Sequence, residues 1–325
     1  MQPNIYVTRE LPEKPMAALR KLGNVICNPE DRMLTHEELM KNVAGMDAVL
    51  CLLTDPIDEA VLKAAGPQCK IFANYAVGYN NIDITAATDC AIWVSNTPGV
   101  LTEATADIAW ALLFSCARRI VEGDRYMREG RFTGWAPKLF LGQDITGATV
   151  GVVGAGRIGG DFARKAKAFG MKVIYHNRRR DEALERNCEA EWVTLPELLQ
   201  RSDYVSLHVP LTMETKHLIG EKELKMMKPT AILINTARGP VVDEKALAKA
   251  LKEGTIWAAG LDVFENEPEY EMELRDLPNV TMMPHVASAT IATRDRMGMM
   301  CVENIQAALS GKLPPNCLNP DARSL

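Results

Sequence analysis

Three side chains in the second half of the chain have the types needed to reduce a carbonyl group beside a carboxylate. Arg238 follows the apolar run Ala231–Asn235, Glu267 lies in the segment Gly260–Pro268, and His285 comes later. An arginine fork suits the carboxylate, and an imidazole suits proton donation near neutral pH. A carboxylate beside the imidazole favours its protonated form. Taken singly, each residue is also typical of a surface charge or of a hydrogen-bonded loop side chain.

A glycine-rich turn precedes these residues. Gly154-Ala155-Gly156-Arg157-Ile158-Gly159 follows the apolar run Thr149–Val153 and opens a predicted helix, Gly159–Phe169. In a dinucleotide-binding turn, the first glycine makes the tight turn and the second lets the backbone approach the pyrophosphate. The third lets helix and strand pack closely. Since other glycine turns share this spacing, the strand and helix around it carry the prediction.

The end of the next predicted strand bears on the choice of dinucleotide. It reads Asn177-Arg178-Arg179, with no carboxylate to accept hydrogen bonds from the ribose hydroxyls. Arginines can bind a 2′-phosphate through paired hydrogen bonds. The pattern favours NADP(H) and leaves NAD(H) possible, while a solvated basic turn is the alternative interpretation.

These residues need strands and helices to position them, and two series of apolar runs alternate with helical patterns. The first series predicts strands at Asn4–Thr8, Asn24–Cys27, Ala48–Leu53, Ile71–Val77 and Ile92–Ser95. The helices between them are expected at Met16–Leu22, Thr35–Val43, Asp58–Ala65 and Ile82–Thr88, with Thr35 and Glu38 spaced as a capping box. The second series predicts strands at Val150–Val153, Lys172–Tyr175, Tyr204–His208, Ala231–Asn235 and Ala258–Asp262. Its helices are expected at Gly159–Phe169, Leu195–Arg201 and Glu244–Glu253, and a final helix at Ser288–Leu309. Strands buried on both faces under crossover helices predict an α/β protein with two doubly wound parallel sheets.

The segment between the two series has a different character. A long helical pattern runs over Glu103–Val121, and Asp124–Asp144 then loses any period at its glycines and at Pro137. This second stretch is expected to be a mobile loop or an arm that packs on another subunit.

Composition excludes several classes of protein. The 325 residues are 47% hydrophobic and 24% charged, which is typical of a globular chain. The formal net charge of -5 gives no general attraction to nucleic acid or to a membrane surface. The longest apolar run, Ile108–Phe114, is too short to span a bilayer, and Glu10 and Glu13 interrupt any signal peptide. The eight scattered cysteines form no metal motif and indicate reduced thiols, so a cytoplasmic location without metal is expected.

The segments around Arg238, Glu267 and His285, in this order after the glycine-rich turn, resemble the signatures of the D-isomer-specific 2-hydroxyacid dehydrogenase family. The resemblance covers essentially the whole chain. It implies that these three residues are the catalytic set and that Arg238 and His285 also contact substrate and cofactor. It further implies a flavodoxin-like substrate domain from residues 1–100 and 288–325 and a Rossmann NAD(P)-binding domain from residues 101–287.

The same resemblance implies further binding residues. Val77 and Gly78 match a loop whose backbone N–H groups hold the substrate carboxylate, although a plain glycine turn explains Gly78 equally well. Residues that match the dinucleotide lining are Thr105, Pro210, Thr215, Thr236, Ala237 and Asp262, with Asp262 expected to accept the nicotinamide carboxamide. His208 is a candidate at the adenosine, with a hydrogen-bonded histidine at a strand end as the alternative.

Within the family the chain most resembles glyoxylate and hydroxypyruvate reductases, through the missing strand-end acid and the segment Gly134–Pro137. D-lactate dehydrogenase is an alternative, because pyruvate and glyoxylate differ by one methyl group. D-3-phosphoglycerate dehydrogenase is another, disfavoured by Asn74 where those enzymes carry a basic residue. A non-enzymatic, corepressor-like dinucleotide sensor is the alternative of another class. The expected partners are a small 2-keto acid and a second copy of the chain in a homodimer, with no nucleic acid and no membrane.

Overall fold

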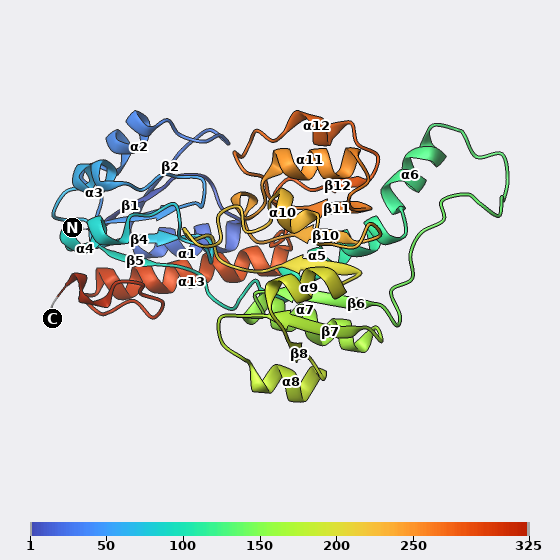
Figure 1. Cartoon of the computed structure of the whole chain (residues 1–325). Helices are drawn as coiled ribbons and strands as arrows, with labels where there is room; N and C mark the ends of the chain where they lie inside the picture. The colour runs from blue at the N-terminus through green and yellow to red at the C-terminus, as the bar shows by residue number, and fades with distance from the viewer. Residues whose placement is uncertain (1, 324–325) are drawn as a thin grey trace. The chain divides into compact units, whose positions relative to one another are not determined.

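The computed structural model describes residues 2–323, which form two compact units. Within the described residues, unit 1 comprises residues 2–101 and 288–323, and unit 2 comprises Thr102–Ala287. Each unit is built on its own parallel sheet with helices on both faces (Figure 1). The predicted fold class, two doubly wound parallel α/β sheets, is confirmed.

Unit 1 contains a five-stranded sheet in the order β2-β1-β3-β4-β5, and every strand pair is parallel. This is the flavodoxin-like order. Its strands are β1 (Asn4–Val7), β2 (Asn24–Cys27), β3 (Ala48–Cys51), β4 (Ile71–Asn74) and β5 (Trp93–Ser95). Its helices are α1 (Glu13–Leu22), α2 (His36–Val43), α3 (Glu59–Ala65), α4 (Ile84–Asp89), α13 (Ile291–Leu309) and the 3-10 turn η2 (Pro320–Ala322). The predicted capping box at Thr35 and Glu38 is present at the start of α2.

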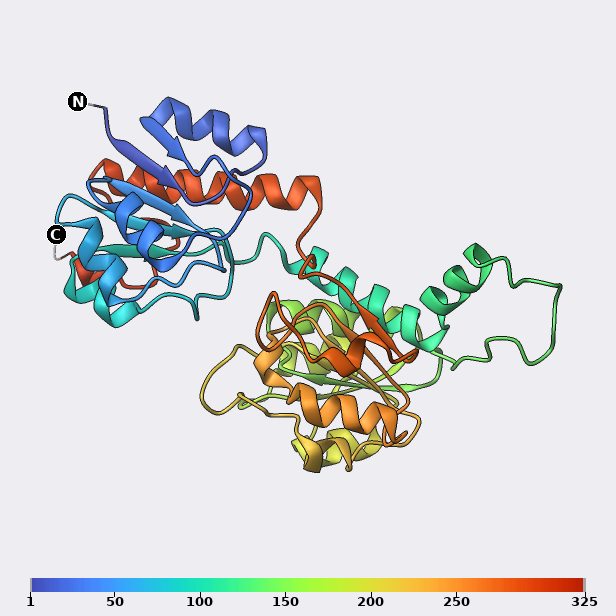
Figure 2. The same cartoon turned by 90° about the horizontal axis from the view of Figure 1, so that it is seen from above.

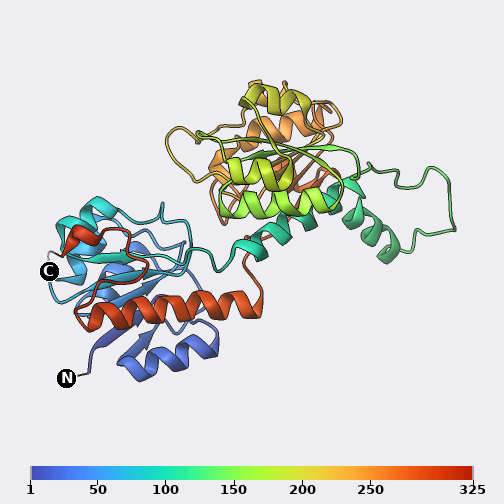
Figure 3. The same ribbon diagram turned by 90° about the horizontal axis from the view of Figure 1, so that it is seen from below.

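Helix α13 explains why the two ends of the chain share unit 1. It packs against α1 and β4, and Figure 3 shows it lying alongside α1. A Cβ at Gly298 would overlap Pro15 of α1, so glycine permits this close approach. The Tyr75 hydroxyl also donates to the Arg294 carbonyl at 2.7 Å. The C-terminal helix therefore completes the layer that covers one face of this sheet.

Unit 2 contains a seven-stranded sheet in the order β12-β11-β10-β9-β6-β7-β8, again with only parallel pairs. The strands are β6 (Thr149–Val153), β7 (Lys172–His176), β8 (Glu191–Trp192), β9 (Tyr204–Leu207), β10 (Ile232–Asn235), β11 (Ala258–Leu261) and β12 (Val280–Met282). The helices are α5 (Thr102–Ala117), α6 (Ile120–Arg128), α7 (Arg157–Ala168), α8 (Glu182–Cys188), α9 (Leu195–Arg201), α10 (Glu221–Leu224), η1 (Gly239–Val241), α11 (Glu244–Lys252) and α12 (Met272–Arg275). The strand order reverses between β6 and β9. In such sheets, ligands bind at the carboxyl ends of the strands beside this reversal.

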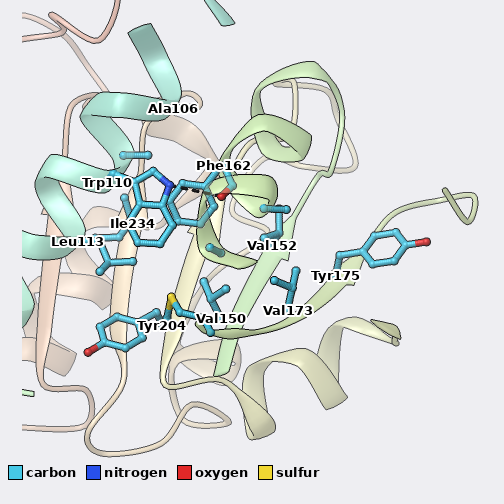
Figure 4. Close-up of a cluster of buried hydrophobic side chains, with 14 of the residues drawn as sticks. Ala106, Trp110, Leu113, Val150, Val152, Phe162, Val173, Tyr175, Tyr204 and Ile234 are labelled. Carbon is cyan, nitrogen blue, oxygen red and sulfur yellow. Dashed lines mark hydrogen bonds between the residues drawn. The ribbon is translucent and has the colours of Figure 1, made fainter. Parts of the chain in front are cut away.

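A buried cluster holds α5 and α7 against the sheet of unit 2. Trp110 of α5 stacks on Phe162 of α7 with ring centroids 4.6 Å apart, and its indole N–H donates to the Phe162 carbonyl at 3.3 Å (Figure 4). Such an aromatic pair contributes about 0.5–1.5 kcal/mol beyond its burial. The cluster fixes α7, whose first turn follows the glycine-rich loop.

The long helix predicted over Glu103–Val121 is present as α5 and is wrong only at its C-terminal end, because α5 ends at Ala117. The chain breaks at Arg119, which adopts a left-handed conformation (φ 54°), and α6 then continues to Arg128. The Arg119 guanidinium pairs with Glu122 at 2.7 Å, and this ion pair stabilises the bend. The expected irregular arm therefore begins after α6 rather than at Asp124, and it extends away from the rest of unit 2 in Figure 1 and Figure 2.

Other differences from the sequence-based expectations are smaller. The strand expected at Ile71–Val77 ends at Asn74, and β8, β12 and α8 were not anticipated. Within residues 2–323, no helix has the length and apolar character to cross a bilayer. The same residues contain no group of three His, Cys, Asp or Glu side chains arranged to hold a metal ion.

Candidate active site

The turn after β10 carries Arg238, and a buried asparagine shapes it. The Asn235 side chain accepts from the N–H of Ala237 at 3.1 Å and donates to the Arg238 carbonyl at 3.0 Å. Arg238 itself is partly buried, and its Nη1 donates to the Ala237 carbonyl at 2.8 Å. The sequence prediction omitted Asn235, although a polar residue ending an apolar strand was a usable signal.

His285 and Glu267 form a direct pair. His285 Nδ1 lies 2.8 Å from Glu267 Oε2, and the Phe264 N–H donates to Glu267 Oε1 at 2.9 Å. Their side chains are 24% and 27% exposed, so the pair is shielded but remains within reach of a small ligand. Since Glu267 occupies Nδ1, the other ring nitrogen, Nε2, is available for a substrate. The structure therefore brings two of the three predicted catalytic residues into contact.

The local charges favour an ionised Glu267. Burial raises its pKa, but the hydrogen bond and charge of His285, the Phe264 N–H and the charge of Arg238 outweigh burial and hold the pKa below its usual value. Burial also lowers the pKa of the Arg238 guanidinium, an effect that the Glu267 carboxylate opposes. An arginine remains charged despite such a shift. Arg238, Glu267 and His285 thus form one electrostatically linked group.

Asp262 anchors the segment that bears His285. Its carboxylate accepts from the N–H groups of Val286 at 2.8 Å and Ala287 at 2.9 Å, while the Asp262 carbonyl accepts from the His285 N–H at 2.8 Å. These bonds hold His285 in a left-handed conformation (φ 53°), which is uncommon outside glycine. Asp262 is fully buried, and burial raises its pKa against the effect of the two N–H donors. The structure therefore gives Asp262 an anchoring role, and its expected contact with a nicotinamide stays a prediction.

The glycine-rich loop lies at the strand reversal between β6 and β9, and its three predicted glycines differ in what requires them. Gly154 has φ +91°, and a Cβ there would press on Val209. A Cβ at Gly159 would overlap the Gly154 carbonyl. A Cβ at Gly156 would meet nothing within 4 Å, so packing among the described residues does not require a glycine here.

The start of α7 fits an anion. Helix α7 begins at Arg157, and its first turn includes Ile158. Gly156 is the N-cap residue and has no side chain to accept from the N–H groups of this turn. Uncapped N–H groups and the positive end of the helix dipole together bind phosphate groups. The loop and the helix start therefore fit the pyrophosphate of a dinucleotide.

The remaining predicted cofactor residues fall at the carboxyl ends of β9 and β10 and on α5. Thr236 and Ala237 directly follow β10, and Thr236 Oγ1 is buried with no hydrogen-bond partner among the described residues. Thr105 is buried on α5. The Thr215 hydroxyl donates to the Pro210 carbonyl at 2.6 Å and so braces the loop after β9. An unsatisfied hydroxyl such as that of Thr236 suits a bound group with a polar atom.

His208 follows β9 beside this loop. Its Nε2 lies 2.9 Å from Ser206 Oγ, whereas Nδ1 is buried and lacks a partner within residues 2–323. Burial lowers the pKa of His208 to about 3, so its imidazole is neutral at physiological pH.

Asn177, which directly follows β7, connects this strand to the glycine-rich loop. Its Oδ1 accepts from the N–H of Ala155 at 2.7 Å, which ties the glycine-rich loop to β7. Arg178 and Arg179 are exposed, whereas Arg180 pairs with Glu185 at 2.7 Å. Two cations therefore remain exposed where the ribose of a dinucleotide is expected.

In unit 1, the predicted substrate loop follows β4. The Asn74 amide donates to the Gly78 carbonyl at 2.9 Å, and the Asn96 amide donates to the Val77 carbonyl at 2.8 Å. No described residue accepts from the N–H of Val77 or Gly78. Two adjacent N–H groups on a braced loop can bind an anion.

Comparison with known proteins places this geometry in a family. A Rossmann unit that itself carries an Arg-Glu-His group is typical of an NAD(P)-dependent oxidoreductase. The family model "D-isomer specific 2-hydroxyacid dehydrogenase, NAD binding domain" matches residues 110–287. The chain belongs to the D-isomer specific 2-hydroxyacid dehydrogenase family.

Three relatives illustrate the similarity. Glyoxylate reductase of Thermococcus litoralis is 50% identical over 99% of this chain and 98% of its own length. The crystal structure of a glyoxylate reductase from Paecilomyes thermophila has a TM-score of 0.86 and 34% identity, covering 98% of each chain. That of the NADPH-dependent glyoxylate/hydroxypyruvate reductase from Sinorhizobium meliloti, in complex with NADP and malonate, has a TM-score of 0.87 and 32% identity over both whole chains.

Proposed function

We propose that this enzyme reduces glyoxylate and hydroxypyruvate with NADPH, yielding glycolate and D-glycerate. The observation that carries the proposal is the His285–Glu267 pair at 2.8 Å, electrostatically linked to Arg238 in the unit that fits a dinucleotide. The similarity to glyoxylate reductases over 99% of the chain supports the substrate class. A small keto acid needs one cation and one proton donor, and this group supplies both.

The roles of the three residues follow from their contacts. Arg238 binds the carboxylate and polarises the carbonyl of the keto acid through its planar fork. The reduced nicotinamide, when bound, supplies the hydride for the carbonyl carbon. Protonated His285 donates the proton on Nε2 to the carbonyl oxygen, because Glu267 holds Nδ1. Glu267, kept ionised by its surroundings, stabilises the imidazolium before donation and orients the ring afterwards.

The dinucleotide would be held by the loop and strand ends already described. The N–H groups at the start of α7 bind the pyrophosphate, and Thr236 and Ala237 border the nicotinamide. Arg178 and Arg179 bind the 2′-phosphate of NADPH, while Asn177 brings no negative charge to repel it. This is the basis for proposing NADPH over NADH.

The loop after β4 is proposed as a second carboxylate-binding element. Hydrogen bonds to the carbonyls of Val77 and Gly78 brace the loop, and no described residue accepts from its two N–H groups, which can therefore bind a carboxylate. This role belongs to unit 1, for which we propose the name substrate domain, and unit 2 is the corresponding dinucleotide domain.

The arm is proposed to form a homodimer interface. Between Ile120 and Leu141, large apolar side chains are exposed, among them Trp135 at 85% and Leu141 at 63%. Clustered exposed apolar groups of this kind mark interaction sites.

A reducing, cytoplasmic location fits the eight cysteines, all of which are free thiols.

The proposed activity is tested by a two-by-three kinetic matrix. NADPH and NADH are each combined with glyoxylate, hydroxypyruvate and pyruvate, and kcat/KM is measured for every pair. The highest values are expected for NADPH with glyoxylate and hydroxypyruvate. A larger kcat/KM for pyruvate than for both of these would reassign the enzyme to D-lactate formation.

A further inference from the structure

A buried glutamate outside the catalytic group anchors the segment that carries Glu267. Glu244 begins α11 and is only 5% exposed. Its Oε1 accepts from the Glu265 N–H, and its Oε2 accepts from the Glu271 N–H at 2.8 Å. One carboxylate therefore closes both ends of the segment 265–271, and Glu267 lies inside that segment.

The same segment touches the turn of Arg238. A Cβ at Gly239 would overlap the Phe264 carbonyl and the Glu265 nitrogen, so the two backbones are in direct contact. The chain from Arg238 to Glu244 runs through η1, and Glu244 then bonds back to the Glu267 segment. The short chain from Arg238 to Glu244 thus fixes the position of Arg238 relative to the segment that carries Glu267.

The surroundings of the buried Glu244 side chain on balance disfavour its ionised form. Burial raises its pKa, the two backbone N–H groups counter burial, and the charges of Glu265 and Glu271 oppose ionisation again. A carboxylate can accept from both N–H groups at once. A glutamine would accept from one and direct its own NH2 group at the other, so only an acid satisfies both donors.

We propose that Glu244 is a positioning residue for the reduction, acting through Glu267 and hence through the His285 pair. This inference rests on the proposed function, since it assigns Glu244 a part in the same reaction. Glu244 is buried, and its described hydrogen bonds join backbone N–H groups of the Glu267 segment, so its loss should affect proton transfer rather than cofactor binding.

The test is a double-variant cycle with Glu244→Gln and Glu267→Gln. In the wild-type background, Glu244→Gln should lower kcat for glyoxylate about tenfold, with the dissociation constant of NADPH changed less than about twofold. In the Glu267→Gln background it should change kcat little, because the group through which it acts is already altered. Equal losses of kcat in both backgrounds would mean a general structural role and would overturn the proposal.

A matched control separates this effect from a weakened α11. Asp243 caps α11 by accepting from the Ala246 N–H at 3.0 Å and makes no contact with the segment 265–271 in the described hydrogen bonds. Asp243→Ala should lower thermal stability. It should change kcat by the same factor in the wild-type background as in the Glu267→Gln background.

Hydrogen exchange supplies a readout without substrate. In Glu244→Gln, the amides of Glu265 and Glu271 should exchange faster than in the wild type, while the amides of β11 should not. Unchanged protection of both amides would overturn the anchoring itself. A wild-type enzyme that reduces no 2-keto acid would instead overturn the proposed function, together with the role of Glu244 in it.

Discussion

His208 should make unit 2 sensitive to mild acid. Burial lowers its pKa to about 3 in the folded protein, whereas an unfolded histidine has a pKa of about 6.5. Below pH 6.5 the unfolded chain binds a proton that folded His208 does not bind. The free energy of unfolding therefore falls as the pH drops from about 6.5 toward 3.

The size of this effect follows from the two pKa values. Between pH 7 and pH 5, His208 alone should remove about 2 kcal/mol from the free energy of unfolding. At pH 5 the result depends almost entirely on the unfolded pKa, because a native value anywhere below about 4 leaves His208 neutral there. The His208→Gln variant cannot titrate, so its stability should fall about 2 kcal/mol less over the same interval.

The assay must report unit 2 alone. In a Trp93→Phe background, the four remaining tryptophans (Trp110, Trp135, Trp192 and Trp257) all belong to unit 2, so urea unfolding is followed by their fluorescence. Phe162→Leu is the matched control. It removes the ring whose centroid lies 5.2 Å from that of the His208 ring, and it removes no titratable group. It should lower stability equally at both pH values. If His208→Gln and the parent lose stability in parallel between pH 7 and pH 5, the reasoning is refuted.

The other predictions concern catalysis, cofactor choice and assembly. Glu267→Gln removes the carboxylate that pairs with His285 Nδ1 at 2.8 Å, so kcat for reduction should fall about tenfold or more while the dissociation constant of NADPH changes little; an unchanged kcat would contradict the pairing. Asn177→Asp combined with Arg178→Ser should shift the ratio of kcat/KM from NADPH toward NADH by about tenfold or more, and an unaltered ratio would show that this strand end does not select the cofactor. The proposed homodimer should give a dimer mass by light scattering at micromolar concentration, and Trp135→Glu should weaken it; a wild-type monomer would rule it out.

The sequence predicted those parts of the fold that rest on periodic patterns. Strands buried on both faces, such as Val150–Val153, leave uninterrupted apolar runs. In contrast, β8 is a two-residue edge strand, Glu191–Trp192, with both residues exposed, so it leaves no pattern to detect. The bend at Arg119 was missed because an arginine, rather than a glycine or proline, adopts the left-handed conformation there.

In the candidate site, the proposed catalytic residues were predicted from the sequence, whereas the residues that position them were not. Arg238, Glu267 and His285 were predicted from residue type, order and family resemblance, and the contact between Glu267 and His285 is present. The residues that hold them were not predicted. Glu244 reads in the sequence as an ordinary acid in the first turn of a helix, because its partners are backbone N–H groups 21 and 27 residues away. Long-range bonds to backbone groups leave no spacing in the sequence.

The divided composition of unit 1 has a consequence for how the chain is made. Strands β1 to β5 leave the ribosome early, but α13, which covers α1 and β4, follows only after the whole of unit 2. At about 5–20 residues per second, the sheet of unit 1 waits about 10–40 s for its last helix. Unit 2 is synthesised during that time as one continuous stretch of chain, and its last strand, β12, ends at Met282, shortly before α13 begins at Ile291. The apolar face that α13 covers therefore has no native partner through most of synthesis, and loose collapse or chaperone binding must protect it from aggregation until α13 emerges.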